Sequence, residues 1–266
     1  MSKRTDYTTQ LFGLSLFSSS RSLLLKELQK KISNLSQLSY IVTPNPEQVI
    51  QASKDEKFAK LLQEADYVIP DGVGLVWASR ILSQKQHQFP LSSRIAGREV
   101  VADLFKLTRE NQQKILVIGG KDYHQAKDVI VNQLQSGVYQ LSKNGFDFYW
   151  SPAFADVTHQ TQEEKNKLSS QIAALKPDIV MAAFGAPAQE EWLFANKALL
   201  TNAQVKLAMA VGGSIDYFLG LVSPVPGLME FLNLEWFWRL ITQPWRLKRQ
   251  LRLIEFMFLV FKQLVK

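Results

Sequence analysis

Residues 67–77 read YVIPDGVGLVW, an apolar run that stops at Pro-Asp-Gly and then becomes apolar again. A buried strand, a sharp turn and a helix would produce this pattern, because Gly72 permits a tight turn and Pro70 withholds a backbone donor. The turn leaves one carboxylate, Asp71, directly after the strand. From these residues two interpretations of Asp71 stay open: it caps the following helix, or it serves as a general base at a sheet edge.

Short apolar runs alternate with amphipathic segments along much of the chain, which indicates an α/β fold with a Rossmann-like, mostly parallel sheet flanked by helices. Strands are predicted in SYIVTPN (39–45), ADYVIPDG (65–72), QKILVIGG (113–120), PDIVMAAFG (177–185) and VKLAMAVGG (205–213), and QLSKNGFDFYW (140–150) is predicted as a strand that runs into a loop. Helices are predicted over 46–60, from Gly72 onward, from Asp122 to about Gln135, over 163–175, after the 185–190 turn and after Gly213.

Polar and glycine residues gather where the predicted strands end, and ligands of parallel α/β sheets bind at that edge. The five segments concerned are TPN (43–45), PDG (70–72), GG (119–120), GAPAQE (185–190) and GGSID (212–216). Glycine lets backbone N–H groups approach a phosphate, and the following helix N-terminus adds a favourable dipole. One Gly-Gly pair is usually an ordinary turn, but several together favour a diphosphate-bearing ligand.

Several familiar chemistries are not indicated by the sequence. It has no cysteine, which excludes disulfides, thiol catalysis and thiolate metal sites. Neither nucleotide fingerprint, G-x-G-x-x-G or G-x-x-x-x-G-K-[ST], occurs, and there is no Asp-x-Asp pair to clamp a metal-bound diphosphate. His87, His124 and His159 are scattered without metal-ligand spacing and are expected at the surface. We therefore expect neither a metal site nor a cofactor.

Positive charge is concentrated at the C-terminus. The chain of 266 residues has a formal net charge of +7, and residues 239–266 hold seven basic residues against Glu255 alone. Pro224 and Pro226 end the α/β pattern, so we expect a boundary near residue 226. It would separate an α/β catalytic body (1–226) from a basic, aromatic helical appendage (227–266).

A helix from Pro244 onward would place Arg246, Arg249 and Arg252 along one side and aromatic residues elsewhere. Such a helix suits a membrane interface, where it meets acyl chains and anionic headgroups together. A solvated basic face and a contact with a neighbouring subunit are the alternatives. No apolar run approaches the roughly 18 residues that span a bilayer, and no signal peptide is recognised.

Six segments occur in an order that resembles the WecG/TagA/CpsF glycosyltransferases, bacterial enzymes that build wall teichoic acid linkers and other surface polysaccharides. They are TPNPEQV (43–49), ADYVIPDGVGLVWASRI (65–81), SRIAGREV (93–100), FGAPAQEEW (184–192), AVGGSIDYFLG (210–220) and LEWFWRLITQPWRLKR (234–249). The resemblance covers about residues 10–255. It departs from the family pattern at Arg98, at Ala188 and in SPVPG (223–227), which bears on the sugar and the acceptor more than on the reaction.

The resemblance implies an inverting, metal-independent transfer of a hexose, of the N-acetylmannosamine type or related, from a UDP-sugar to a polyprenyl-diphosphate-linked sugar. By position, Asp71 is the base that deprotonates the acceptor hydroxyl, Arg94 is an active-site arginine, and Gln189 reaches the sugar or leaving group. The substrate-binding positions it implies are Thr43, Asn45, Gly119, Gly120, Gly185, Gly212, Gly213 and Asp216. The positions it implies for the lipid diphosphate are Arg239, Arg246 and Arg249.

A protein of this kind is expected in the cytoplasm, held peripherally on the inner face of the cell membrane by the appendage, and a homo-oligomer is compatible with it. Two other functions stay open. One is a catalytically idle protein that binds a UDP-sugar or a lipid diphosphate. The other is a basic nucleic-acid-binding protein, which is disfavoured because the charge lies in a Trp- and Phe-rich tail without a recognisable nucleic-acid-binding motif. We expect no nucleic-acid partner.

Overall fold

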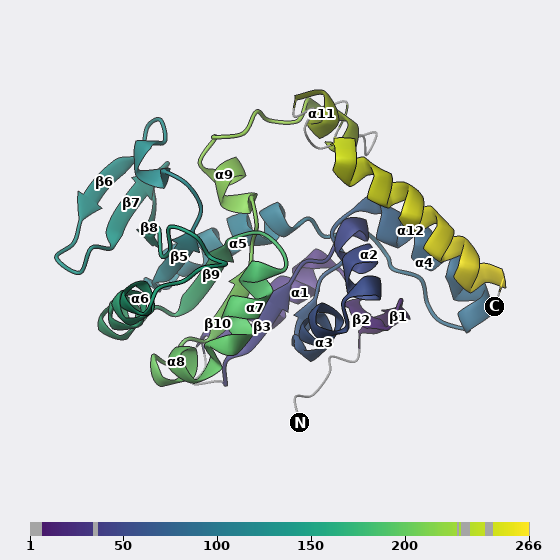
Figure 1. The fold of residues 1–266 in the computed structure, drawn as a ribbon, viewed down its shortest axis with the longest axis horizontal. Helices are drawn as coiled ribbons and strands as arrows, with labels where there is room; N and C mark the ends of the chain where they lie inside the picture. Colours follow the sequence, from purple (N-terminus) through teal and green to yellow (C-terminus); the bar gives the residue numbers. More distant parts are fainter. Residues whose placement is uncertain (1–6, 34–36, 228, 230–234, 243–246, 266) are drawn as a thin grey trace.

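The computed structural model describes residues 7–33, 37–227, 229, 235–242 and 247–265. It contains an α/β fold, as predicted, with helices on both faces of one large sheet (Figure 1). The strands are β1 Thr8–Leu11, β2 Leu14–Phe17, β3 Ser39–Val42, β4 Tyr67–Val68, β5 Ile115–Gly119, β6 Ile130–Gln133, β7 Tyr139–Lys143, β8 Phe146–Ser151, β9 Ile179–Ala183 and β10 Leu207–Ala210. The helices are α1 Arg21–Ser33, α2 Pro46–Lys54, α3 Glu56–Glu64, α4 Val73–Gln86, α5 Gly97–Glu110, η1 Tyr123–Gln125, α6 Gln162–Leu175, α7 Ala188–Ala195, α8 Lys197–Asn202, α9 Ser214–Phe218, α11 Glu235–Thr242 and α12 Leu247–Val265.

The large sheet has eight strands in the order β4-β3-β10-β9-β5-β8-β7-β6. The six strands from β4 to β8 are parallel, and β7 and β6 extend the sheet in antiparallel pairing. This confirms the mostly parallel sheet. The carboxyl ends of β3, β4, β9 and β10 consequently lie at one edge, although the strands are far apart in the sequence.

Apolar side chains of the central strands alternate between two cores, one on each face of the sheet. In β5, Leu116 and Ile118 belong to one core and Ile115 and Val117 to the other, which is why this strand reads as a continuous apolar run. Helices α1, α5 and α9 cover one face. Helices α2, α3, α4, α6, α7, α8 and α12 contribute to the core on the other face.

The helix predicted over 46–60 is two helices, α2 and α3. Pro46 stands at the first helical position of α2, where its missing N–H is not needed. Asp55 ends this helix in an extended conformation, and its side chain accepts a hydrogen bond of 3.1 Å from the N–H of Phe58 as the N-cap of α3. The hydrophobic spacing runs through this break, so the spacing alone predicted one helix.

The helix predicted from Asp122 to about Gln135 is wrong. Asp122 takes a left-handed conformation with φ 50°, only the short turn η1 follows, and the chain then enters strand β6. Ile130 and Val131 of this edge strand are exposed. The segment 140–150 was predicted as a strand that runs into a loop, but it is a hairpin in which both β7 and β8 are strands. The N-terminal hairpin β1–β2 and helix α1 were not predicted.

The C-terminal helix α12 runs along α2 and α4 (Figure 1). Phe256 and Val260 are each 2% exposed and join the same core as the sheet. An ion pair joins Lys54 of α2 to Glu255, which adds a polar contact to this docking. The division at residue 226 into body and appendage stays a prediction.

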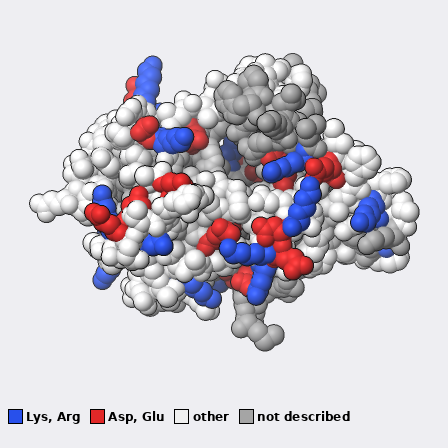
Figure 2. Space-filling model, in the orientation of Figure 1, with Lys and Arg blue, Asp and Glu red and all other residues white. Residues whose placement is uncertain are grey.

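Within the described ranges, no helix has both the length and the apolarity needed to cross a membrane. On the face seen in Figure 2, basic and acidic side chains are intermixed rather than separated into fields of one sign. Among the residues coloured in this view, no broad basic surface of the kind that nucleic-acid-binding proteins use is present.

Candidate active site

A pocket of about 830 Å³ opens at the carboxyl edge of the sheet, between the ends of β3, β4, β9 and β10 and the side of α12. Ligands of parallel α/β folds bind at such an edge. Eight of the residues that the sequence nominated line it: Thr43, Asn45, Asp71, Arg94, Gly185, Gln189, Gly212 and Gly213. The structure thus brings together residues from four separate strand ends.

Asp71 follows β4 and is half-buried in the pocket wall. Its own N–H donates to the carbonyl of Pro44 at 3.0 Å, which ties the end of β4 to the end of β3. Its Oδ2 accepts a hydrogen bond of 3.3 Å from the N–H of Gly97, the first residue of α5. Gly72, not Asp71, holds the N-cap position of α4. The carboxylate therefore serves the start of a different helix from the one that follows it in the chain.

The turn after Asp71 requires glycine. Gly72 has φ +113° and ψ 139°, a backbone conformation that side-chain-bearing residues rarely adopt. A Cβ at this position would lie 3.2 Å from Cδ of Pro46. The turn thus lets the start of α4 approach the start of α2, and this close approach places Asp71 beside Asn45 and Thr43 in the pocket.

Three arginines line the pocket, against the two carboxylates Asp71 and Glu47. Arg94 lies in the segment that the 3.0 Å hydrogen bond from the N–H of Ile95 to the carbonyl of Pro70 holds beside β4. Arg98 comes from α5, and its guanidinium lies 5.1 Å from the ring centre of Tyr217. Arg252 reaches the pocket from α12. This lining favours an anionic ligand.

Gln189 is nearly buried in the first turn of α7, at 4% exposure. Its Oε1 accepts from the N–H of Gly212 at 2.9 Å, and its Nε2 donates to Oε1 of Glu190 at 3.0 Å. Both Oε1 and Nε2 of Gln189 thus each make one hydrogen bond within the protein. The side chain joins the start of α7 to the turn after β10, and it still borders the pocket.

Glu190 is fully buried, and sequence reasoning did not single it out. Burial raises the pKa of its carboxyl group from the ordinary 4.5 to about 7, although hydrogen bonds from Gln189 and Gln48 oppose the shift. Its neighbour Glu191 is partly exposed and pairs with Lys57 at 2.9 Å. Two consecutive glutamates in one helical turn gave no sign in the sequence of which one points inward.

Gly119, Gly120 and Asp216, the remaining positions nominated in the body, do not line this pocket. Gly120 and Asp216 lie against Tyr123: a Cβ on Gly120 would lie 2.2 Å from the Tyr123 ring, and the Tyr123 hydroxyl hydrogen-bonds to Asp216. Gly119 lies beside Phe184. Burial raises the pKa of Asp216, and the Tyr123 hydrogen bond opposes the shift. The indole N–H of Trp150 donates to the carbonyl of Gly119 at 2.8 Å. Helix α9 begins in the pocket and carries Asp216 to this second cluster.

The nominated arginines of the C-terminal segment lie outside what the structure describes. Arg246 is not among the described residues, and the side chains of Arg239 and Arg249 are not described. Arg252, three positions after Arg249, does line the pocket. Sequence reasoning placed it on the same side of the predicted helix but did not nominate it.

The pocket also has an apolar wall that the sequence analysis did not predict. It is formed by Val73 and Trp77 of α4 and by Leu253, Phe256 and Met257 of α12. Val73 and Trp77 lie in the first two turns of α4 and are each 40% exposed, which is unusual for large apolar side chains. Their spacing of four residues was a signal, but it could not show that α12 would face them.

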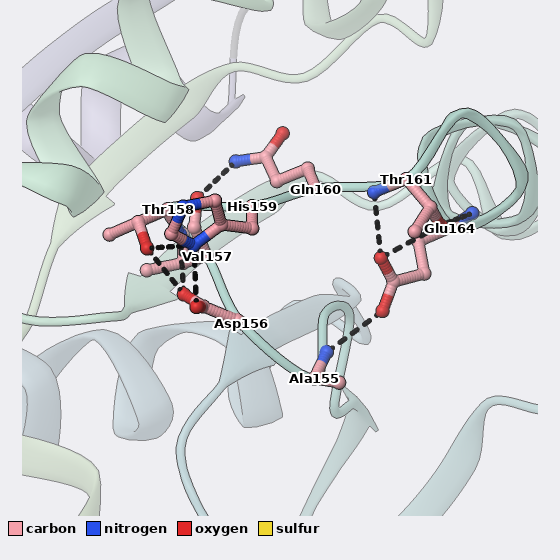
Figure 3. Close-up of polar contacts among 8 residues, drawn as sticks. All are labelled: Ala155, Asp156, Val157, Thr158, His159, Gln160, Thr161 and Glu164. Carbon is pink, nitrogen blue, oxygen red and sulfur yellow. Dashed lines mark hydrogen bonds and ion pairs between the residues drawn. The ribbon is translucent and has the colours of Figure 1, made fainter.

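The loop between β8 and α6 is held by its own polar contacts (Figure 3). Its residues do not line this pocket. Asp156 accepts hydrogen bonds from the Thr158 side chain and from His159, and these bonds lower its pKa. Glu164 accepts from the N–H groups of Ala155 and Thr161. His159 is an exposed loop residue, as expected for all three histidines.

For His124 that expectation is wrong. This side chain is half-buried and stacks against Tyr139 and Trp150, with ring centres 5.5 and 5.3 Å away. In the part of the chain that the structure describes, no three His, Asp or Glu side chains are grouped so that they could hold a metal ion.

The fold and the pocket together define a mostly parallel α/β protein whose site is lined by three arginines, favours an anionic ligand and holds the half-buried carboxylate of Asp71 in its wall. Comparison with known proteins gives the family. The model of the glycosyl transferase WecG/TagA/CpsF family matches residues 9–266. The chain belongs to the WecG/TagA/CpsF glycosyltransferase family, and the protein is a glycosyltransferase.

Two relatives show the extent of the similarity. A protein of Bacillus subtilis (strain 168) is 33% identical over 223 residues, which are 84% of this chain and 79% of the relative. A protein of Staphylococcus aureus (strain NCTC 8325 / PS 47) is 30% identical over 223 residues, 84% of this chain and 80% of the relative. Both relatives are named N-acetylglucosaminyldiphosphoundecaprenol N-acetyl-beta-D-mannosaminyltransferase.

Proposed function

We propose that this protein transfers N-acetylmannosamine, or a closely related hexose, from a UDP-sugar to an N-acetylglucosamine carried on a polyprenyl diphosphate, with inversion at the anomeric carbon. The reaction would serve the synthesis of a cell-surface polysaccharide. The observation that carries the proposal is the position of Asp71: a half-buried carboxylate at the sheet edge, in a pocket lined by Arg94, Arg98 and Arg252. The names of the two relatives support the choice of donor and acceptor.

In the proposed reaction, an acceptor hydroxyl gives its proton to the carboxylate of Asp71 as its oxygen forms a bond to the anomeric carbon. The bond between that carbon and the diphosphate oxygen breaks, and UDP leaves with the electron pair. Attack on the side opposite to the leaving group converts an α-linked donor into a β-linked product. The β linkage in the names of the relatives is consistent with this outcome.

The pocket arginines would stabilise the negative charge on the diphosphates. Arginine forks match phosphate geometry, and fixed charges in a partly buried site can contribute several kcal/mol to a transition state. Thr43 and Asn45 would hold the sugar near the base, since both border the pocket beside Asp71. Gly119, Gly120 and Asp216 would lie toward the nucleotide, which reaches them past the start of α9. In this proposal no metal ion takes part.

Helix α12 would bring the pocket to a membrane that holds the acceptor. The residues of its outer stripe recur at helical spacing and are more than half exposed: Ile254, Met257, Phe258, Phe261 and Val265. Met257 belongs both to this stripe and to the lining of the pocket. Apolar side chains beside a basic helix suit the interface of an anionic membrane. A lipid-linked acceptor could then enter the pocket without leaving the membrane.

The test is a transfer assay with UDP-N-acetylmannosamine and N-acetylglucosaminyl-diphosphate-polyprenol, with and without EDTA. We expect a disaccharide with a β linkage by NMR, and an unchanged rate in EDTA. A panel of other UDP-hexoses tests the donor. Absence of product with every donor, while UDP still binds in calorimetry, would favour the idle binding protein instead. A rate abolished by EDTA and restored by a divalent ion would overturn the metal-independent mechanism.

The membrane proposal needs its own measurement, because the same stripe could pack against a second subunit. Flotation with vesicles of anionic lipid should carry the protein to the top of a density gradient, and Phe258→Ser with Phe261→Ser should abolish this. If the double variant instead changes the molecular mass in light scattering and leaves vesicle binding intact, the stripe is a subunit contact.

A further inference from the structure

A continuous chain of hydrogen bonds runs behind the pocket and joins two of the strand ends that form it. At one end, the N–H of Asn45 donates to Oε1 of Gln48 at 3.1 Å. Nε2 of Gln48 then donates to Oε1 of Glu190 at 3.3 Å. From the other side, Nε2 of Gln189 donates to the same Glu190 oxygen at 3.0 Å, and Oε1 of Gln189 accepts from the N–H of Gly212 at 2.9 Å. Glu190 is the point where the two halves meet.

The acceptor atom Oε1 of Glu190 determines the orientation of both glutamine carboxamides. Oε1 of Glu190 accepts from both side chains, so Gln48 and Gln189 each present their NH₂ group to it. The carboxamide oxygens then point away from Glu190. That of Gln48 meets the N–H of Asn45 and completes the capping box of α2, whereas that of Gln189 meets the N–H of Gly212. Rotation of either amide would set two donors or two acceptors against each other.

We infer that Glu190 is a positioning residue for glycosyl transfer: it fixes the orientation of Gln189 and Gln48, and through them the pocket wall between Asn45 and Gly212. Asn45, Gln48, Gln189 and Gly212 all line the pocket, while Glu190 lies behind them. Glu190 does not touch the substrate in this arrangement. By accepting from one N–H of the Gln189 amide, Glu190 fixes the direction of the second N–H and the position of the Gly212 turn. The inference rests on the proposed function, since the pocket must be the transfer site.

The burial of Glu190 supports a specific role rather than general packing. Its side chain is fully buried, and its Oε2 has no hydrogen-bond partner among the described residues. A buried polar group without a partner destabilises a protein, so an apolar side chain of similar size would pack here at lower cost. The two hydrogen bonds to Oε1 are what an apolar side chain could not replace.

Two substitutions at residue 190 separate positioning from packing. Glu190→Gln keeps an oxygen that can accept from both neighbouring amides. The other orientation of the new carboxamide is disfavoured, because its NH₂ group would face the NH₂ groups of Gln48 and Gln189. Glu190→Met keeps the volume and removes the acceptor. The matched control is Glu191→Gln, which changes the adjacent and partly exposed glutamate that pairs with Lys57.

The first readout is hydrogen exchange of the Gly212 amide, which does not depend on activity. We expect faster exchange in Glu190→Met and wild-type protection in Glu190→Gln and Glu191→Gln. The second readout is steady-state kinetics. We expect kcat to fall roughly 10- to 100-fold in Glu190→Met, because a misplaced group costs rate more than binding, and to stay within about 3-fold of the wild type in the other two variants.

Each failure has a distinct signature. Unchanged Gly212 exchange in Glu190→Met, or an unchanged kcat in that variant once folded, overturns the positioning role. Loss of kcat and of Gly212 protection in Glu190→Gln equal to that in Glu190→Met also overturns it. If Glu190→Met does not fold, Gln48→Met removes one of the two donors to Glu190 at a half-buried position. The role then requires that kcat of this variant fall at a temperature well below its melting temperature, where the protein is folded. If the wild type transfers no sugar while the exchange pattern holds, the proposed function fails and the hydrogen-bond chain stands.

Discussion

The N–H of Gly97 donates a hydrogen bond of 3.3 Å to the carboxylate of Asp71. Gly97 opens α5, so the carboxylate lies where the helix has unpaired N–H groups and a partial positive charge. This contact fixes the direction of the carboxylate in the pocket wall. A carboxylate held in this direction is positioned to take a proton from an acceptor hydroxyl, which leads to the first prediction.

Asp71→Asn should lower kcat by roughly 10²- to 10⁴-fold, the usual contribution of a general base. The asparagine oxygen can still accept from Gly97, so the melting temperature and the affinity for UDP should change little. Transfer assays, thermal unfolding and calorimetry measure the three quantities.

Asp128→Asn is the control for Asp71, because Asp128 is exposed and does not line the pocket. It should behave as the wild type. If Asp71→Asn keeps more than half of the wild-type kcat, another group takes the proton and Asp71 has only a structural role at the start of α5.

Arg252→Ala should raise KM for the lipid-linked acceptor about 10-fold and leave KM for the UDP-sugar nearly unchanged. Arg252 enters the pocket from α12, whose outer stripe is proposed to face the membrane, so it lies on the acceptor side. A charge-assisted hydrogen bond to a phosphate contributes about 1.5–3 kcal/mol. Lys262→Ala removes an exposed charge from the same helix outside the pocket. An equal rise in KM in both variants would mean that only the overall charge of α12 matters.

Local patterns in the sequence were sufficient for the parallel core of the fold. Strands such as β5 and β9 are short apolar runs with a glycine at or shortly after their end, and both were predicted correctly. The errors came where a single residue changes the backbone. Asp55 ends one helix and caps the next, and Asp122 turns left-handed before an exposed edge strand. A hydrophobic pattern averaged over many residues does not report such points.

The candidate site could be predicted where a residue stands at a strand end, because the topology then brings it to the common edge. Asp71 and Gly212 stand at strand ends in this way, whereas Gln189 was nominated by the resemblance to the family. Glu190 and Trp77 were missed, since their roles depend on which side of a helix faces a neighbour that is distant in the sequence. Gly120 also follows a predicted strand, yet it packs against the Tyr123 ring and does not line the pocket. A position after a strand is therefore not sufficient to place a residue in the pocket.

Phe256→Ala should weaken the docking of α12 on the body, whereas Phe258→Ala should not. Phe256 is 2% exposed and packs edge-on against Phe12 at 5.3 Å, but Phe258 is 70% exposed. Truncation of a buried phenylalanine costs about 3–5 kcal/mol, and a surface change usually stays within about 0.5 kcal/mol. Hydrogen exchange of the α12 amides should accelerate only in Phe256→Ala. Equal protection in both variants would mean that α12 is held by contacts other than this side chain.

Stability should fall as the pH rises from about 5 to 8, and Glu190→Gln should remove part of that fall. Burial raises the pKa of Glu190 from 4.5 in the unfolded chain to about 7 in the native protein, so between these values the native state holds a proton that the unfolded state has released. The stabilisation from this group is complete below pH 4.5 and is lost as the pH passes through 7, with a total on the order of 3 kcal/mol. Urea unfolding at pH 5 and pH 8 measures the slope. Asp216, whose pKa is also raised, contributes equally to both proteins and cancels in the comparison. Parallel slopes for the wild type and Glu190→Gln would show that Glu190 does not change its protonation on unfolding in this range.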